Sequence, residues 1–217
     1  MPKIATPHFV MPRAALELYR FAGSDDSRGN LKYIHFESEK EAGKGKISRF
    51  HAVTTDGHRL MHVSWYGSGQ DSLPCPVHVE AEAAAFLLQN IKKEKISDPP
   101  VKITLSVQNG DVMLMSSTEV GTKDGPYEER MDVGYPDWQQ VVPRPQSEPM
   151  SVSQEVGMDL KYLVDFNKFI WVCGYDTTGV VMHYHDEQSM GPVLWTPMGT
   201  PKDPDVNFEY VLMPMRF

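Results

Sequence analysis

Two hydrophobic periodicities alternate along the chain. Apolar residues recur three or four positions apart in two segments, which predicts amphipathic helices with buried faces at Ala15, Leu18, Tyr19 and Ala22 and at Ala84, Leu87, Leu88 and Ile91. Residues 101–107 instead alternate between apolar and polar side chains, which predicts a strand with one buried face. Turn signals such as Asn109-Gly110 separate the predicted strands. The pattern therefore predicts helices mixed with short strands.

One order of elements occurs three times. Each copy has a short extended lead-in, an amphipathic helix and three strand-like runs, and the copies occupy residues 7–67, 75–135 and 150–217. Consecutive strands joined by tight turns pair antiparallel, and helices mixed with such strands are typical of the α+β class. The expected fold is therefore α+β, with three βαβββ half-units and mainly antiparallel sheets.

The predicted helices also carry charged stripes opposite their apolar faces. Arg13, Glu17 and Arg20 share one stripe, and Lys161, Asp165 and Lys168 share another with the same spacing. The second helix carries Lys92 and Lys93. Two interpretations stay open: these stripes face nucleic-acid phosphates, or they are ordinary solvated faces with internal ion pairs.

Composition sets broad limits on the class of protein. The chain has 217 residues, 41% of them hydrophobic, which is enough for a substantial core in one or two domains. The net charge of -8 disfavours a protein that coats itself with nucleic acid through overall charge, although a local basic stripe is compatible with it. Cys75 and Cys173 have no metal-binding or disulfide spacing. We see no signal peptide and no membrane span, and expect a cytoplasmic protein without a cofactor.

Catalytic motifs are sparse. His183 and His185 lie two apart on a predicted strand and share a face, which is compatible with a metal-dependent enzyme, but no third ligand with recognisable spacing accompanies them. Asp56 and His58 have no candidate nucleophile beside them. No glycine-rich phosphate-binding loop occurs. The sequence therefore predicts a protein that is not an enzyme and has no catalytic residues.

Three short segments resemble one known family. Residues 53–60, VTTDGHRL, resemble the ATDGHRL signature of the bacterial DNA sliding clamp, the beta subunit of DNA polymerase III. Residues 135–143, which begin Tyr-Pro-Asp-Trp and end Val-Val-Pro, are similar to the segment that joins the clamp's middle and last domains. Residues 210–217, YVLMPMRF, are similar to the ending of the same family. The three segments occur in the family's order.

The resemblance implies a shortened clamp. Residues 1–143 resemble a complete middle domain made of two βαβββ halves, and residues 144–217 resemble only the second half of the last domain. The family's first domain and the first half of its last domain have no counterpart. The implied fold is the DNA-clamp fold, and we expect the half-domain to be completed by another chain.

The resemblance also implies a hydrophobic pocket for short linear peptides of DNA polymerases, clamp loaders and repair proteins. Methionine adapts to varied ligands, and His58 and Arg59 are expected to offer donors at its rim. Carried over position by position, the pocket comprises Leu31, Thr55, Gly57, His58, Arg59, Leu60, Pro136, Val141, Val211, Met213, Pro214, Met215 and Arg216.

In this family the helices line a central hole for double-stranded DNA, which they contact without sequence preference. The expected DNA-facing residues are Arg13, Arg20, Lys92, Lys93, Lys161 and Lys168. A clamp ring needs twelve half-units, so we expect a homo-oligomer, a dimer or a tetramer. The alternative is an interaction module or decoy, encoded by a phage or mobile element, that binds clamp partners without encircling DNA.

Overall fold

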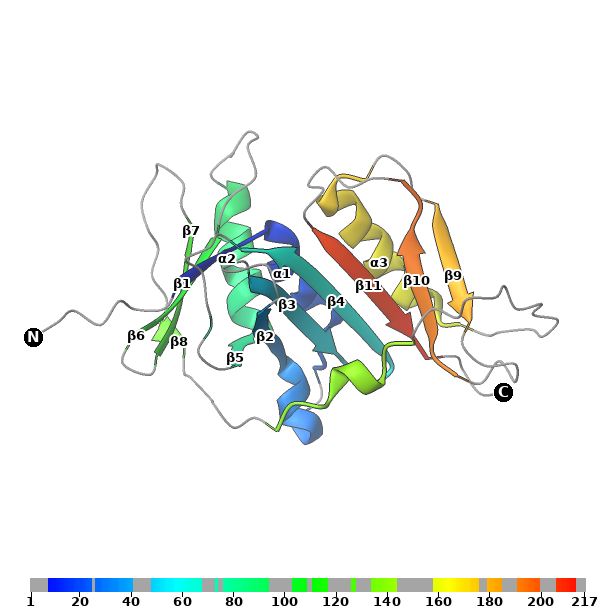
Figure 1. The fold of residues 1–217 in the computed structure, drawn as a ribbon, viewed down its shortest axis with the longest axis horizontal. Helices are drawn as coiled ribbons and strands as arrows, with labels where there is room; N and C mark the ends of the chain where they lie inside the picture. The colour runs from blue at the N-terminus through cyan, green and yellow to red at the C-terminus, as the bar shows by residue number, and fades with distance from the viewer. Residues whose placement is uncertain are drawn as a thin grey trace, which may run out of the picture.

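The computed structural model describes residues 8–24, 26–40, 48–67, 73, 76–93, 103–108, 111–116, 126–127, 134–143, 158–175, 179–184, 191–199 and 206–213. Within these residues, eleven strands form two antiparallel sheets, and three α-helices lie against them (Figure 1). None of the described helices combines the length and the apolar character that a bilayer crossing requires.

The larger sheet has seven strands in the order β5-β2-β3-β4-β11-β10-β9. These are β5 (Val77–Glu80), β2 (Tyr33–Lys40), β3 (Ser48–Thr55), β4 (Arg59–Tyr66), β11 (Asn207–Leu212), β10 (Val193–Pro197) and β9 (Val180–Tyr184). β4 and β11 pair antiparallel, with Leu60 opposite Val211. Because β4 belongs to the first unit and β11 to the third, this pair joins the two units into one continuous sheet (Figure 1).

The smaller sheet has four strands in the order β1-β6-β7-β8. These are β1 (His8–Met11), β6 (Ile103–Gln108), β7 (Asp111–Ser116) and β8 (Pro126–Tyr127). The lead-in strand of the first unit, β1, pairs with β6 of the second unit, and the lead-in strand of the second unit, β5, pairs with β2 of the first. The first two units therefore complete each other by exchanging strands.

The helices lie side by side on one face of the larger sheet. They are α1 (Arg13–Glu17), α2 (Ala81–Lys93) and α3 (Leu160–Cys173), with α1 between the other two (Figure 1). α3 begins after Asp159, whose side chain accepts a hydrogen bond from the backbone N–H of Lys161. It ends at Gly174, whose φ of 69° is the left-handed conformation that favours glycine at this position.

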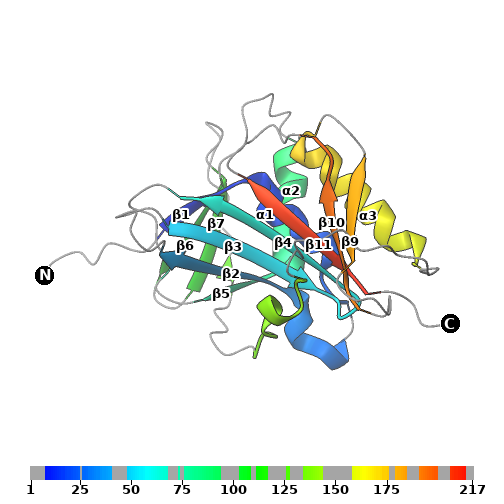
Figure 2. The ribbon, with the colours of Figure 1, turned by 45° about the vertical axis from the view of Figure 1, so that its right-hand side comes forward.

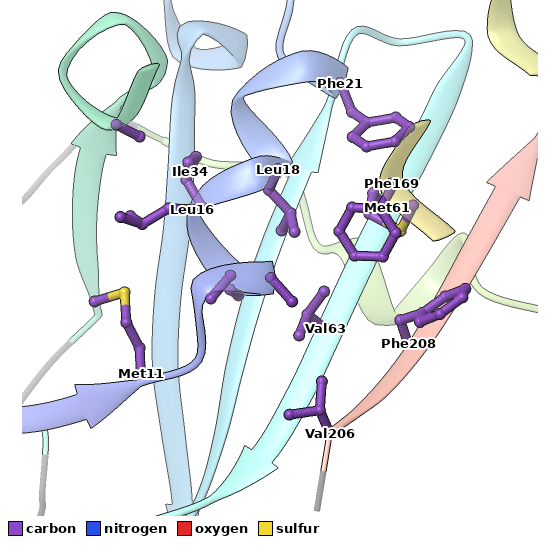
Figure 3. Close-up of a cluster of buried hydrophobic side chains, with 14 of the residues drawn as sticks. Met11, Leu16, Leu18, Phe21, Ile34, Met61, Val63, Phe169, Val206 and Phe208 are labelled. Atoms are coloured by element: carbon purple, nitrogen blue, oxygen red, sulfur yellow. The ribbon is translucent and has the colours of Figure 1, made fainter. Parts of the chain in front are cut away.

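A single core fills the space between the helices and the larger sheet. Phe21, from the 3₁₀ helix η1 (Leu18–Phe21) that follows α1, contacts Phe169 of α3 and Tyr210 of β11, with ring centroids 5.8 and 5.5 Å apart. Figure 3 shows Phe21 and Leu18 pointing toward Met61 of β4 and Phe169. Because each buried aromatic side chain contributes about 1.5–3 kcal/mol, these contacts hold the third unit firmly on the first.

The predicted α+β class and antiparallel sheets are confirmed, and three details differ. The first helix is α-helical only over Arg13–Glu17 and continues as η1. Glu17, which the pattern places on a solvated face, is 0% exposed; that expectation is wrong because Arg13 and Arg20 cover its carboxylate. The last of the three strand-like runs in the second copy is expected at residues 128–135. Residues 128–133 lie outside the described part of the chain, and residues 134–135 are not in a strand.

Candidate functional site

The turn between β3 and β4 is fixed by its own side chains. The Asp56 carboxylate accepts hydrogen bonds from the backbone N–H groups of His58 and Arg59 at 2.9 and 3.0 Å. Thr55 Oγ1 accepts from the Gly57 N–H and donates to the Arg59 carbonyl. Gly57 has a φ of 88°, where a Cβ would be strained. The backbone N–H of Met213 donates to the His58 carbonyl at 2.9 Å, so the end of β11 is attached to this turn.

A second apolar cluster lies on the face of the larger sheet opposite the helices. Four strands contribute one residue each to this outer-face cluster: Val53, Leu60, Val211 and Leu194. All four are at most 3% exposed although they lie outside the main core. They are buried because Trp138, from the segment that links the second and third units, covers them.

This linking segment, the connector (residues 134–143), crosses the outer face of the sheet near the turn and contains the 3₁₀ helix η3 (Trp138–Gln140) (Figure 2). The Tyr135 hydroxyl donates to the Val53 carbonyl at 3.2 Å, and Trp138 Nε1 donates to Glu37 Oε1 at 3.1 Å. Burial raises the pKa of Tyr135, which keeps its hydroxyl protonated as a donor. The connector is therefore held by specific bonds as well as by apolar contact.

A hollow of about 570 Å³ opens beside the connector. It is lined by Asp137, Gln139, Gln140, Val141, Val142, Pro143 and Pro192. Val141 is 39% exposed, and Met213 at the end of β11 is 40% exposed. Exposed apolar side chains beside amide groups are common in sites for a small ligand or peptide.

The connector also covers four histidines on the outer face, the histidine layer (His35, His51, His62 and His78). His51 Nδ1 and His62 Nε2 are 2.9 Å apart, and His35 Nδ1 and His78 Nε2 are 3.0 Å apart. The Tyr135 ring stacks on His35 with centroids 4.8 Å apart, and the Trp138 ring lies 4.4 Å from that of His62. The layer therefore forms part of the support beneath the connector.

Carboxylates flank the histidine layer. Glu209 accepts a hydrogen bond from His62, which lowers the pKa of Glu209, and a hydrogen bond from His35 lowers that of Glu37. Burial, together with the neighbouring His62, lowers the pKa of His51. These shifts favour a neutral His51 beside ionised glutamates near neutral pH.

Several pocket residues expected from the sequence lie together. Leu60 and Val211 are paired in the cluster, Pro136 and Val141 belong to the connector, and Met213 borders the turn. Thr55, Gly57 and His58 form the turn itself. Leu31 is buried beside it, where its carbonyl accepts a hydrogen bond from the Gly23 N–H at 2.9 Å. Pro214, Met215 and Arg216 lie outside the described residues.

Arg59 does not belong to this site. Its guanidinium donates to Asp56, to Asp165 of α3 and to the Arg20 carbonyl, at 2.9–3.0 Å in each case. The expectation that Arg59 offers donors at the rim of the pocket is wrong, because side chains alternate along β4. Leu60 faces outward, so Arg59 points to the helix side.

Other members of the site did not appear in the sequence-based set. Tyr135, Trp138 and Val53 lie inside the segments that resemble the clamp family. Their closeness in sequence to the expected pocket residues could therefore have identified them. Leu194 had no such signal, because only the pairing of β10 with β11 brings it to the cluster, opposite Val211.

The expected DNA-facing cations on the helix side are largely paired with carboxylates. Arg13 and Arg20 both bind the buried Glu17, at 3.2 and 2.9 Å. Lys161 pairs with Asp159 at 3.0 Å, and Lys168 with Asp165 at 3.6 Å. The lysine side chains are 65% and 55% exposed and remain accessible to a ligand. The side chains of Lys92 and Lys93 lie outside the described residues.

The structure describes one of the two histidines that were considered as metal ligands. His183 Nε2 is 2.9 Å from the Thr196 hydroxyl, and His185 lies outside the described residues. Among the residues that the structure describes, no three His, Cys, Asp or Glu side chains are grouped so that they could hold a metal ion.

Comparison with known proteins places this architecture. No protein-family model matches the sequence, and no curated protein matches it. Solved structures do match over the full chain. The beta sliding clamp of Caulobacter crescentus superposes with a TM-score of 0.67 at 18% identity, over 100% of this chain and 68% of the clamp. The DnaN sliding clamp (DNA polymerase III subunit beta) of Bartonella birtlesii, bound to griselimycin, gives a TM-score of 0.69 at 17% identity with the same coverage.

A sliding clamp from Bacillus subtilis matches with a TM-score of 0.57 at 14% identity, over 100% of this chain and 66% of the clamp. At sequence identities this low, a structural match establishes the fold alone. The resemblance read from the three sequence motifs is thus confirmed at the level of structure: the chain has the fold of the bacterial DNA polymerase III beta sliding clamps and spans about two thirds of their length.

Proposed function

We propose that this protein is a clamp-like scaffold, not an enzyme, whose outer-face site binds short linear peptides of DNA polymerases, clamp loaders or repair proteins. One observation carries the proposal. Leu60, Val211 and the connector, which are far apart in sequence, form a single apolar cluster beside the hollow at Val141 and next to Met213. These are the segments through which the sequence resembles the clamp family.

The chemistry of the site fits a peptide with apolar anchors. Val141 and Met213 are exposed apolar side chains at the border of the site, and the amides of Gln139 and Gln140 offer donors and acceptors for a peptide backbone. A few buried anchors supply most of the affinity in such interfaces. Because Trp138 already packs on the outer-face cluster, peptide binding requires little rearrangement of the sheet.

Titration of a fluorescent peptide with leucine and phenylalanine anchors tests this proposal. Met213→Ala should weaken binding about 5- to 30-fold, since truncating a contact residue typically costs about 1–2 kcal/mol. Met198→Ala is the matched control. Met198 is 51% exposed and follows Pro197, at the end of β10 that lies away from Met213. Equal affinities for wild type and Met213→Ala would refute the site.

We further propose that the helix side faces duplex DNA within an oligomeric ring. The exposed Lys161 and Lys168 support sequence-independent contacts with phosphates. Their pairing with Asp159 and Asp165 keeps the net charge of this face low, so retention would depend on topology more than on affinity. A ring is retained on nicked circular DNA and released when the circle is cut. A module that binds clamp partners without encircling DNA shows no difference between the two.

A further inference from the structure

The outward face of α3 is much less covered than those of the other helices. Six of its fourteen residues are exposed, at positions 160, 161, 164, 167, 168 and 171. In α2, only positions 82, 86 and 89 are exposed among residues 81–91, and α1 has no exposed residue. The three helices come from repeated units of one kind. α1 and α2 therefore show how much of such a helix is exposed when its unit is paired with another.

Three of the exposed positions on α3 are large and apolar. Leu160 is 73% exposed, Val164 52% and Trp171 67%. At about 100° per residue they share one narrow strip of the helix surface, the α3 stripe. Tryptophan is among the side chains enriched at the energetically important centres of protein interfaces. Exposed apolar strips of this kind are typical of surfaces that become buried in an assembly.

We propose that the α3 stripe packs against the α3 stripe of a second copy of this chain, about a twofold axis. The architecture identifies the occupant. The first unit is completed by a second unit of the same kind, through strand exchange and the contact of α1 with α2. The third unit has no such mate among the described residues, and a second copy offers an identical unit with the same exposed strip.

The spacing of the stripe is self-complementary. Leu160 and Trp171 lie equally far from the midpoint between Asp165 and Phe166, and so do Val164 and the exposed Asn167. An antiparallel helix pair centred on this midpoint places Leu160 of one copy opposite the second copy's Trp171. Isologous contacts of this kind are the commonest in homo-oligomers.

Charge does not oppose the contact. Lys161 and Lys168 border the stripe, and each is paired with a carboxylate of the same segment, Asp159 or Asp165. The inference concerns the face of the sheet opposite the proposed peptide site and does not depend on peptide binding.

Sedimentation equilibrium of the full chain at micromolar concentration tests the proposal. Wild type should sediment as a dimer or a multiple of it. Val164→Glu and Trp171→Glu should each weaken self-association at least tenfold, because a buried unpaired carboxylate replaces an apolar contact. Phe86→Glu is the matched control, since Phe86 is 64% exposed on α2, outside the stripe, and should leave association unchanged.

A charge exchange tests the antiparallel register. Leu160→Glu and Trp171→Lys should each disrupt the dimer, whereas the double variant should restore it at low salt by pairing Glu with Lys across the axis. A monomeric wild type, or dimers that persist in Val164→Glu and Trp171→Glu, would overturn the proposal. Circular dichroism shows whether each variant is folded, and peptide titration of the same variants separates failure of this inference from failure of the peptide site.

Discussion

Arg59 and Asp165 are 106 residues apart in sequence, and their side chains form an ion pair of 2.9 Å between β4 and α3. The Arg59 guanidinium also lies over the rings of Phe21 and Tyr162, at 5.0 and 4.9 Å. Arg59 is 8% exposed, so its charge depends on these partners. The pair thus joins the first and third units on the helix side, while the connector joins the units on the opposite face.

Asp165→Ala should destabilise the fold. It leaves the buried Arg59 with one carboxylate partner, Asp56, instead of two. We expect a loss of about 1–3 kcal/mol, below the usual cost of breaking a fully buried pair because Asp56 remains. Urea unfolding measures the effect. Lys168→Ala is the control, since it removes only the exposed partner of Asp165 and should change stability by less than about 0.5 kcal/mol.

Gly57→Ala tests the turn that attaches β11 to the first unit. Its φ of 88° disfavours any residue with a Cβ, so the variant should lose about 1–2 kcal/mol of stability and should also bind peptide more weakly. Gly29→Ala is a suitable comparison, because a Cβ at Gly29 meets nothing within 4 Å and the backbone there is not strained. Equal stabilities of the two variants would argue against a strained turn.

Trp138→Ala should affect the outer face selectively. The variant removes the cover of Val53, Leu60, Leu194 and Val211 and the hydrogen bond to Glu37. We expect a loss of about 2–4 kcal/mol in unfolding free energy and at least a tenfold loss of peptide affinity. Gln140→Ala, in the same 3₁₀ helix but exposed, should leave the unfolding free energy nearly unchanged. A Trp138→Ala protein that binds peptide normally would show that the connector does not form the site.

Stability should fall on mild acidification because of the histidine layer. The pKa of His51 is lowered in the folded state by burial and by His62, so the unfolded chain binds more protons as pH drops below about 6.5. The stabilisation from a neutral His51 is present above that pH and is lost below it. Glu39 and Arg49 also face His51 and modulate the shift. Urea unfolding at pH 7.5 and 5.5 measures the effect, and His51→Gln should reduce the difference; an unchanged difference would remove His51 as its source.

A further decrease in pH should cause a second loss of folding stability. Hydrogen bonds from His35 and His62 lower the pKa values of Glu37 and Glu209, so the stabilisation that these carboxylates provide is present above about 4.3 and is lost as pH falls through the folded values.

The sequence predicted much of this structure where the signal was local. The alternation in residues 101–107 and the helical spacing around Leu87 correspond to β6 and α2. The three motifs identified the clamp fold because they are the segments that meet at one site. Relations set by strand pairing were harder to see, and Leu194 joins the site only through β10. The prediction that Arg59 points to the pocket was wrong because a motif match does not show which face of a strand a side chain takes.

Glu17 shows a different limit. A charged residue at helical spacing from Arg13 and Arg20 predicts a solvated stripe, but α3 packs beside α1 and leaves the carboxylate buried under both arginines. Whether Glu17 is exposed or buried depends on the tertiary contact between the first and third units. The periodicity of a single helix carries no information about that contact.

Hydrogen–deuterium exchange with and without an anchor-bearing peptide tests the central claim most directly. If the outer-face site binds the peptide, protection should increase in the connector, residues 134–143, and at residues 211–213, with little change in α3. Protection confined to α3, or no change in the connector at saturating peptide, would contradict the proposed function.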